Sequence, residues 1–147
     1  MRLNKLSKYF YSDGIKFKCQ KCGACCNIED GVVYLLKKDI YNLSSFFNIE
    51  IGEFKDKYTT LTEEGSFIIK DIHSSICRFQ KNNRCSVYPA RPTQCRLYPF
   101  WSTLMKDRSL FYSENCPGIG KGNLVDFEKI TDSIIKHRKF LNELERI

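Results

Sequence analysis

Eight cysteines in a chain of 147 residues are the feature of this sequence with the clearest chemical potential. Four of them form one short run, in which C-x2-C spacings link Cys19, Cys22 and Cys25, and Cys26 follows directly. A C-x2-C turn lets two thiolates converge on one metal ion, and a tetrahedral zinc ion needs two further ligands from elsewhere. The remaining cysteines can supply them: Cys77, Cys85, Cys95 and Cys116. The sequence therefore predicts metal binding by all eight thiols, at one or two centres.

An iron–sulfur centre competes with zinc as the predicted cofactor. The spacing of Cys19, Cys22 and Cys25 is that of the first three ligands in bacterial ferredoxin sequences, and Cys116 precedes a proline, as the remote ligand often does. The four-cysteine ferredoxin run is not completed locally, however. Spacing alone does not choose between zinc and an iron–sulfur cluster.

The adjacent pair Cys25 and Cys26 constrains how the thiols divide into sites. Neighbouring side chains of extended backbone point in opposite directions, so one site does not easily use both. Either the two face different sites, or one is a free thiol, and a strained vicinal disulfide is a third arrangement. For the whole set, the alternative to metal binding is a protein that is held together by disulfides or is merely rich in cysteine.

Other residues give weaker signals. Arg91 and Arg96 bracket Cys95, and each could either donate a hydrogen bond to a thiolate sulfur or pair with a surface carboxylate. His73 and His137 could each ligate a metal, although eight cysteines leave little need for them. The glycine-rich segment 118–122 lacks the frame of a phosphate-binding loop and is expected to be a loop before the last helix.

The formal charge of +7, from 24 Lys and Arg against 17 Asp and Glu, raises the question of a nucleic-acid partner. That count treats the cysteines as neutral, whereas metal ligation deprotonates thiols. Eight thiolates with two divalent ions would remove about four charges and leave roughly +3. The lysines are also scattered and build no long basic block. Metal ions are therefore the predicted partners, nucleic acid is not favoured, and a protein partner stays open.

The hydropathy pattern predicts a cytoplasmic protein with no membrane segment. Residues 1–14 are basic but lack the apolar run of a signal peptide. The longest wholly apolar run, Val32–Leu36, is far shorter than the ~20 residues that span a bilayer. Thiols stay reduced in the cytosol, where they tend to be metal ligands or catalysts, so disulfides are disfavoured.

The apolar periodicity then indicates the elements that must position the cysteines. Two short helices are predicted from residues at helical spacing: Leu36, Ile40, Leu43 and Phe47 for the first, and Ile51, Phe54, Tyr58 and Leu61 for the second. Strand-like runs are Ile15–Lys18, Val32–Leu35 and Phe67–Ile69. A β-hairpin with a cysteine on each arm is predicted from Ile76–Phe79 and Cys85–Tyr88, around a polar turn at Lys81–Arg84.

A long C-terminal helix is predicted over about 124–145. Its apolar seam steps by three and four residues: Phe127, Ile130, Ile134, His137, Leu141 and Leu144. Asn123 or Asp126 could cap its start. The predicted fold is α+β: a small single metal-stapled domain over residues 1–147, with short helices, a β-hairpin and this helix.

The cysteine motifs resemble those of the YkgJ-type CxxCxxCC cysteine-cluster family. The shared motifs are Cys19-x2-Cys22-x2-Cys25-Cys26, Cys77-Arg78-Phe79, Cys85-Ser86-Val87-Tyr88, Arg91-Pro92-x2-Cys95-Arg96-x-Tyr98-Pro99-Phe100 and Cys116-Pro117-Gly118. The similarity covers about residues 17–120. It implies zinc or iron chelation at the eight cysteines, and related clusters occur in flagellin lysine N-methylases.

Two functions from different classes follow. The first is a metal-binding protein in which zinc or an iron–sulfur centre has a structural or accessory role. The second is an enzyme, either a flagellin N-methylase-like protein methyltransferase or a redox protein that uses an iron–sulfur cluster. No cofactor-binding motif for a methyl donor is visible in the sequence, so the first function is preferred.

Overall fold

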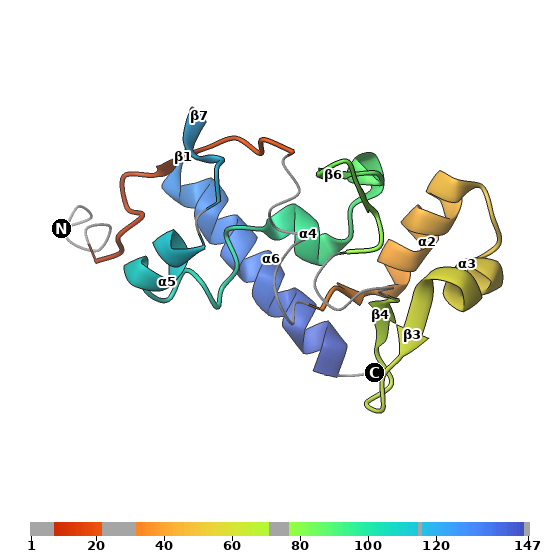
Figure 1. Ribbon diagram of the computed structural model, residues 1–147. Coiled ribbons are helices and arrows are strands. Elements are labelled where there is room, and N and C mark those ends of the chain that lie inside the picture. Colours follow the sequence, from red (N-terminus) through yellow and green to blue (C-terminus); the bar gives the residue numbers. More distant parts are fainter. Residues whose placement is uncertain (1–7, 22–31, 71–76, 115, 146–147) are drawn as a thin grey trace. The chain divides into compact units, whose positions relative to one another are not determined.

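The computed structural model describes residues 8–21, 32–70, 77–114 and 116–145. The chain divides into two compact units. Unit 1 consists of Met1–Gln20 and Pro99–Arg138, and unit 2 of Lys21–Tyr98 and Lys139–Ile147. Helices and small antiparallel sheets occur together along the chain, which confirms the predicted α+β class (Figure 1). Within the described residues, no helix is both long enough and apolar enough to cross a membrane.

Unit 1 contains a two-stranded antiparallel sheet of β1 (Ile15–Phe17) and β7 (Ile119–Val125). It also contains the short helix α5 (Arg108–Ser113) and the start of the long helix α6 (Phe127–Glu145). Figure 1 shows β1 beside β7, directly before α6 begins. An apolar core joins these elements through Tyr11, Ile15, Phe100, Met105, Phe111, Ile130 and Ile134. The β1–β7 pair is the part of this unit that positions cysteines.

Strand β7 occupies residues 119–122 of the segment that was expected to be a loop, so that expectation was wrong there, while Gly118 lies in a turn just before the strand. Lys16 pairs with Leu124 and Phe17 with Ile119, so the β7 residues between these two pairs form an irregularity in the ladder. Two glycines in this excursion have positive φ, 88° at Gly120 and 71° at Gly122, a conformation that side chains rarely tolerate. Glycine therefore marks a bulged strand here rather than an open loop.

Helix α6 confirms the predicted C-terminal helix. The Oδ1 of Asp126 accepts a hydrogen bond from Lys129 N at 2.9 Å, so Asp126 is the cap. Ile130, Ile134 and His137 are buried as their spacing predicts. The next buried position is Phe140, whereas Leu141, which the pattern favoured, is half-buried.

Unit 2 is built on the helices α2 (Lys37–Phe47) and α3 (Ile51–Tyr58) and on a three-stranded antiparallel sheet in the order β2-β4-β3. The strands are β2 (Tyr34–Leu35), β3 (Thr59–Leu61) and β4 (Phe67–Ile69). The core consists of Leu35, Ile40, Leu43, Phe54, Ile69, Phe79, Val87 and Ala90. Both predicted helices are confirmed.

The second helix is shorter than its apolar pattern indicated. It ends at Tyr58, and Thr59 is already extended, with φ −124° and ψ 157°. Leu61 lies in β3 and is 59% exposed, so its place on the helical face was wrong. The β-branched residues Thr59 and Thr60 favour a strand here and pair with Ile69 and Ile68.

The predicted hairpin is confirmed, with strands closer to the turn than expected. They are β5 (Gln80–Lys81) and β6 (Arg84–Cys85), followed by the 3₁₀ turn η2 (Tyr88–Ala90) and the helix α4 (Thr93–Leu97). Asn82 and Asn83 form the two-residue connection with φ of 52° and 60°. Such left-handed pairs match the twist of a hairpin, and asparagine tolerates them well.

Candidate metal centre

Five of the eight predicted ligands lie in the described residues, and all five are half-buried: Cys19, Cys77, Cys85, Cys95 and Cys116. Cys22, Cys25, Cys26 and His73 lie outside the described residues. Within the described ranges, no three His, Cys, Asp or Glu side chains form a group that could hold a metal ion. The full ligand set therefore stays a prediction, and the structure tells which local elements carry its members.

The strand pair of unit 1 brings Cys19 and Cys116 to the same end of one sheet. Phe17 is the partner of Ile119, and Lys18 N extends the ladder by donating to the Gly118 carbonyl at 3.1 Å. Cys19 follows Lys18 directly, while Cys116 lies just before Gly118 on the antiparallel partner. Adjacent strands lie ~5 Å apart. Two cysteines from opposite ends of the sequence are therefore neighbours in the fold.

The close approach of the two chain segments depends on the absence of a side chain at Gly118. A Cβ built there would lie 2.4 Å from the Lys18 carbonyl oxygen and 2.9 Å from the Phe17 ring. Real Cβ atoms essentially never come that close to backbone, so any larger residue must push the two strands apart. Sequence reasoning missed this role because Gly118 was assigned to a loop. The signal was the glycine directly after Cys116-Pro117.

The hairpin of unit 2 carries Cys77 and Cys85. Cys85 lies on β6 opposite Gln80, and Gln80 N donates to the Cys77 carbonyl at 3.0 Å, which turns the chain into the hairpin. Ser86 N donates to the Phe79 carbonyl at 2.8 Å and extends the pairing toward Cys77. Both cysteines pack against the apolar core of unit 2. Cys77 thus precedes the first arm rather than lying on it.

Cys95 is at the centre of α4, and two side chains hold that short helix in place. The buried carboxylate of Asp39 accepts from Thr93 N at 2.9 Å, from Thr93 Oγ1 at 2.7 Å and from Leu36 N at 3.0 Å. Gln94 bonds through both ends of its amide, accepting from Tyr34 N at 3.0 Å and donating to the Val32 carbonyl at 2.9 Å. These bonds tie Cys95 to the chain around β2 and the start of α2. Neither Asp39 nor Gln94 was anticipated from the sequence.

The two arginines around Cys95 have other partners than those considered from the sequence. Within the described residues, Arg91 Nε donates to the Tyr88 carbonyl at 3.1 Å, and Arg96 Nε donates to the Arg91 carbonyl at 2.7 Å. The Arg91 guanidinium also lies 3.8 Å from the Tyr88 ring centroid, and the Lys21 ammonium lies 4.7 Å from the same centroid. Two cations therefore interact with the Tyr88 ring, and one of them, Lys21, lies within the first C-x2-C turn.

His137 is a buried structural residue in unit 1. Ser102 N donates to its Nδ1 at 3.0 Å, the Ser102 hydroxyl lies 2.8 Å from the same nitrogen, and the Trp101 ring stacks on the imidazole at 5.4 Å. A backbone N–H can only donate, so Nδ1 is the acceptor and the neutral ring carries its proton on Nε2. Burial lowers the pKa of His137 to about 4. Neither nitrogen of this neutral ring offers a metal a lone pair, so the geometry does not fit a ligand role.

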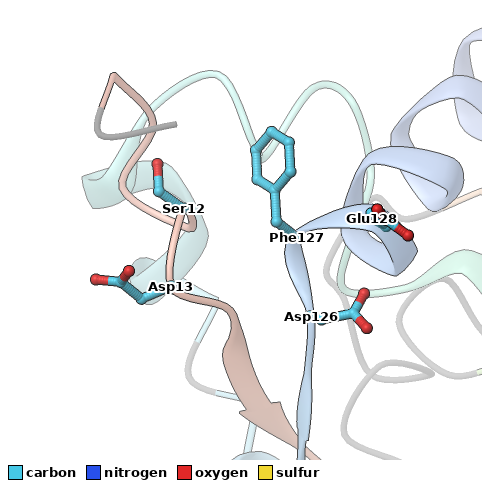
Figure 2. A pocket seen from close by; sticks show the side chains of 5 residues that line it. All are labelled: Ser12, Asp13, Asp126, Phe127 and Glu128. Carbon is cyan, nitrogen blue, oxygen red and sulfur yellow. The ribbon is translucent and has the colours of Figure 1, made fainter. Parts of the chain in front are cut away.

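An open pocket of about 440 Å³ lies in unit 1 at the start of α6. It is lined by Ser12, Asp13, Asp126, Phe127 and Glu128, and no cysteine is among these residues (Figure 2). Figure 2 shows the Asp13 carboxylate directed away from those of Asp126 and Glu128. Carboxylates that diverge in this way do not form a cation site, and Asp126 is engaged as the cap of α6.

Comparison with known proteins supports the cysteine motifs as the functional feature. The sequence model of the CxxCxxCC family, described as "Putative zinc- or iron-chelating domain", matches residues 18–117. A relative from Methanocaldococcus jannaschii, named "Uncharacterized protein MJ0661", is 25% identical over 150 residues, which cover 95% of this chain and 80% of the relative. No solved structure matches the chain. The match spans the segment that contains all eight cysteines and supports metal binding, and the chain belongs to the CxxCxxCC family.

Proposed function

We propose that the protein binds zinc or iron through the thiolates of its eight cysteines and that the metal has a structural or accessory role. The observation that carries this proposal is the antiparallel register of β1 and β7, which makes neighbours of Cys19 and Cys116. Thiolates that converge from two segments of the chain are typical of a structural metal site. The family match gives the same chemistry independently.

The donor set fits either metal. Thiolates are soft ligands that suit tetrahedral zinc and iron–sulfur clusters. Eight thiols fill two four-thiolate sites, and we assign Cys19 and Cys116 to the same one. A structural zinc ion would contribute ~10–16 kcal/mol of apparent binding energy to folding, which is large against the stability of a small domain.

Nearby cations would offset the charge that thiolates introduce. Lys21 lies within the first C-x2-C turn, and it shares the Tyr88 ring with Arg91. A four-thiolate zinc site carries a net charge of about −2, which positive side chains close to it stabilise.

The test begins with protein purified without oxygen, metal analysis and a visible absorption spectrum. Zinc at one or two equivalents without colour supports the structural role, and a chelator should then lower the unfolding temperature. Iron with acid-labile sulfide and a broad band near ~400 nm also supports metal binding, but with an iron–sulfur centre. Protein that binds no metal, with its thiols oxidised to disulfides, would refute the proposal.

The pairing of Cys19 with Cys116 has its own test. The Cys19→Ser and Cys116→Ser variants should each lose the same metal equivalent, and the double variant should lose no more than either single one. A double variant that loses two equivalents places the cysteines in different centres. Ser45→Ala, at an exposed position of α2, is the control and should keep the full metal content.

A further inference from the structure

We propose that Gln94 is a positioning residue of the metal centre, acting through its neighbour Cys95. This inference rests on the proposed function, and it adds a residue that neither the family match nor the cysteine motifs single out. The side-chain amide of Gln94 bridges α4 to the chain around β2, which joins the two segments at a point next to a predicted ligand.

The geometry of this bridge is that of a backbone pairing. Gln94 Oε1 accepts from Tyr34 N at 3.0 Å, and Gln94 Nε2 donates to the Val32 carbonyl at 2.9 Å. One amide thus satisfies a donor and an acceptor two residues apart in the chain, as a neighbouring strand would. Both hydrogen bonds need the amide in one orientation. The side chain therefore fixes the direction of α4 as well as its distance from the chain around β2.

Asp39 also anchors the helix that carries Cys95. Its carboxylate holds Thr93 N and Thr93 Oγ1 at the first turn of α4 and Leu36 N at the start of α2. With Gln94, the chain on either side of Leu35 is bonded to two consecutive residues of α4. Cys95 follows directly, so these hydrogen bonds hold the backbone that carries its thiol.

Preorganisation of this kind raises metal affinity, because less ordering is left to the binding step. Residues that orient a ligand from the next layer outward typically change metal affinity by about 10- to 100-fold when they are removed. Asp39 also supports the fold, since it is 3% exposed and bonds three donors. Gln94 is the better probe, because its bond to Val32 is exposed and serves one local junction.

The test measures Zn²⁺ affinity by competition with a chromophoric chelator, together with the visible spectrum of the Co²⁺-substituted protein. Four forms are compared: wild type, Gln94→Ala, Cys95→Ser and the double variant. We expect Gln94→Ala to weaken Zn²⁺ binding about 10-fold and to alter the Co²⁺–thiolate bands. In the Cys95→Ser background the same substitution should have no further effect on affinity, because the ligand through which Gln94 acts is gone.

Two further variants separate positioning from folding. Gln94→Glu keeps the acceptor for Tyr34 N but loses the donor to Val32, so its affinity should fall between those of wild type and Gln94→Ala. Gln20→Ala is the matched control, since it removes a glutamine beside a cysteine whose bond, 2.7 Å to the Lys18 carbonyl, spans only two residues. Its Zn²⁺ affinity should stay within about two-fold of wild type.

The outcomes are distinguishable. If Gln94→Ala leaves Zn²⁺ affinity unchanged, or weakens it equally with and without Cys95, the positioning role is refuted while metal binding stands. A wild-type protein that binds neither Zn²⁺ nor Co²⁺ overturns the proposed function and this inference with it.

Discussion

Replacing Gly118 by alanine should separate the strands that carry Cys19 and Cys116. The new Cβ would lie 2.4 Å from the Lys18 carbonyl oxygen, whereas ordinary van der Waals contact begins at 3.4 Å. The strands must therefore part by about 1 Å, since the obstructing atom is backbone and cannot rotate away.

The loss of stability expected for Gly118→Ala follows from two local effects. Overpacking of this kind typically destabilises a fold by about 1–3 kcal/mol. The hydrogen bond from Lys18 N to the Gly118 carbonyl, 3.1 Å long, is strained or lost as well, which adds about 1 kcal/mol. We expect the free energy of unfolding to fall by about 2–4 kcal/mol and the Tm by roughly 6–12 °C.

Two assays test this expectation, and one substitution controls for it. Thermal unfolding of the metal-free protein measures the strain, and Zn²⁺ competition measures the effect on the centre that we assign to Cys19 and Cys116. Gly52→Ala, in α3, introduces a Cβ with no heavy atom within 4 Å and should be neutral or stabilising by up to ~1 kcal/mol. If Gly118→Ala matches wild type in both Tm and Zn²⁺ affinity, the close approach of β1 and β7 is not what holds this pair of cysteines.

Three further perturbations probe the framework around the centre. Because burial lowers the pKa of His137 to about 4, the unfolded state binds this proton more readily than the folded state between about pH 6.5 and pH 4. The metal-free protein should therefore lose up to about 3 kcal/mol of stability as the pH falls through that window. Urea unfolding at several pH values measures this loss. A His137→Gln variant whose free energy of unfolding falls equally steeply with pH would contradict the expectation. Asp39→Ala should destabilise unit 2 by about 3 kcal/mol, because it leaves the buried N–H of Leu36 and the half-buried N–H of Thr93 without their acceptor. Asp39→Asn should lose less stability than Asp39→Ala. Equal losses of unfolding free energy for the two variants, measured by urea unfolding, would show that hydrogen bonding is not the cause. Asn83→Gly should stabilise the protein by about 0.5 kcal/mol in the same assay, because the left-handed φ of 60° suits glycine. A destabilised variant would mean that the contacts of the asparagine side chain outweigh this backbone preference.

Elements with strong local patterns were predictable from the sequence. The spacing of Ile40 and Leu43 located α2, and the run from Phe127 to His137 located most of α6. Apolar residues repeated at the helical period indicate an amphipathic helix, because they fall on one face of it. The polar turn at Asn82 and Asn83 likewise located the hairpin. In each case the determinant lies within one short segment of chain.

Features set by distant partners were not predictable. The close approach of Gly118 to the Lys18 carbonyl could not be seen in the sequence, because the two residues are far apart in the chain. Thr59 ended α3 early because β4 was available as a partner, and apolar spacing alone gives no information on that. The candidate cysteine ligands were identified by type and spacing, whereas their grouping into centres depends on strand register, which spacing does not give. The single-domain organisation over residues 1–147 also stays a prediction, which one cooperative unfolding transition would support and two would contradict.

The shortness of α4 has a consequence for the order of assembly. A helix of five residues has no stability of its own in water, since isolated helices shorter than about 12–15 residues are marginal. Thr93–Leu97 can become helical only after the start of α2 and β2 have formed, because the side chain of Asp39 and the backbone groups of Val32 and Tyr34 supply its anchoring hydrogen bonds. The position of Cys95 therefore depends on the rest of unit 2. Under the proposed function, the Cys95 thiolate would therefore take its place at a metal together with the formation of this part of unit 2.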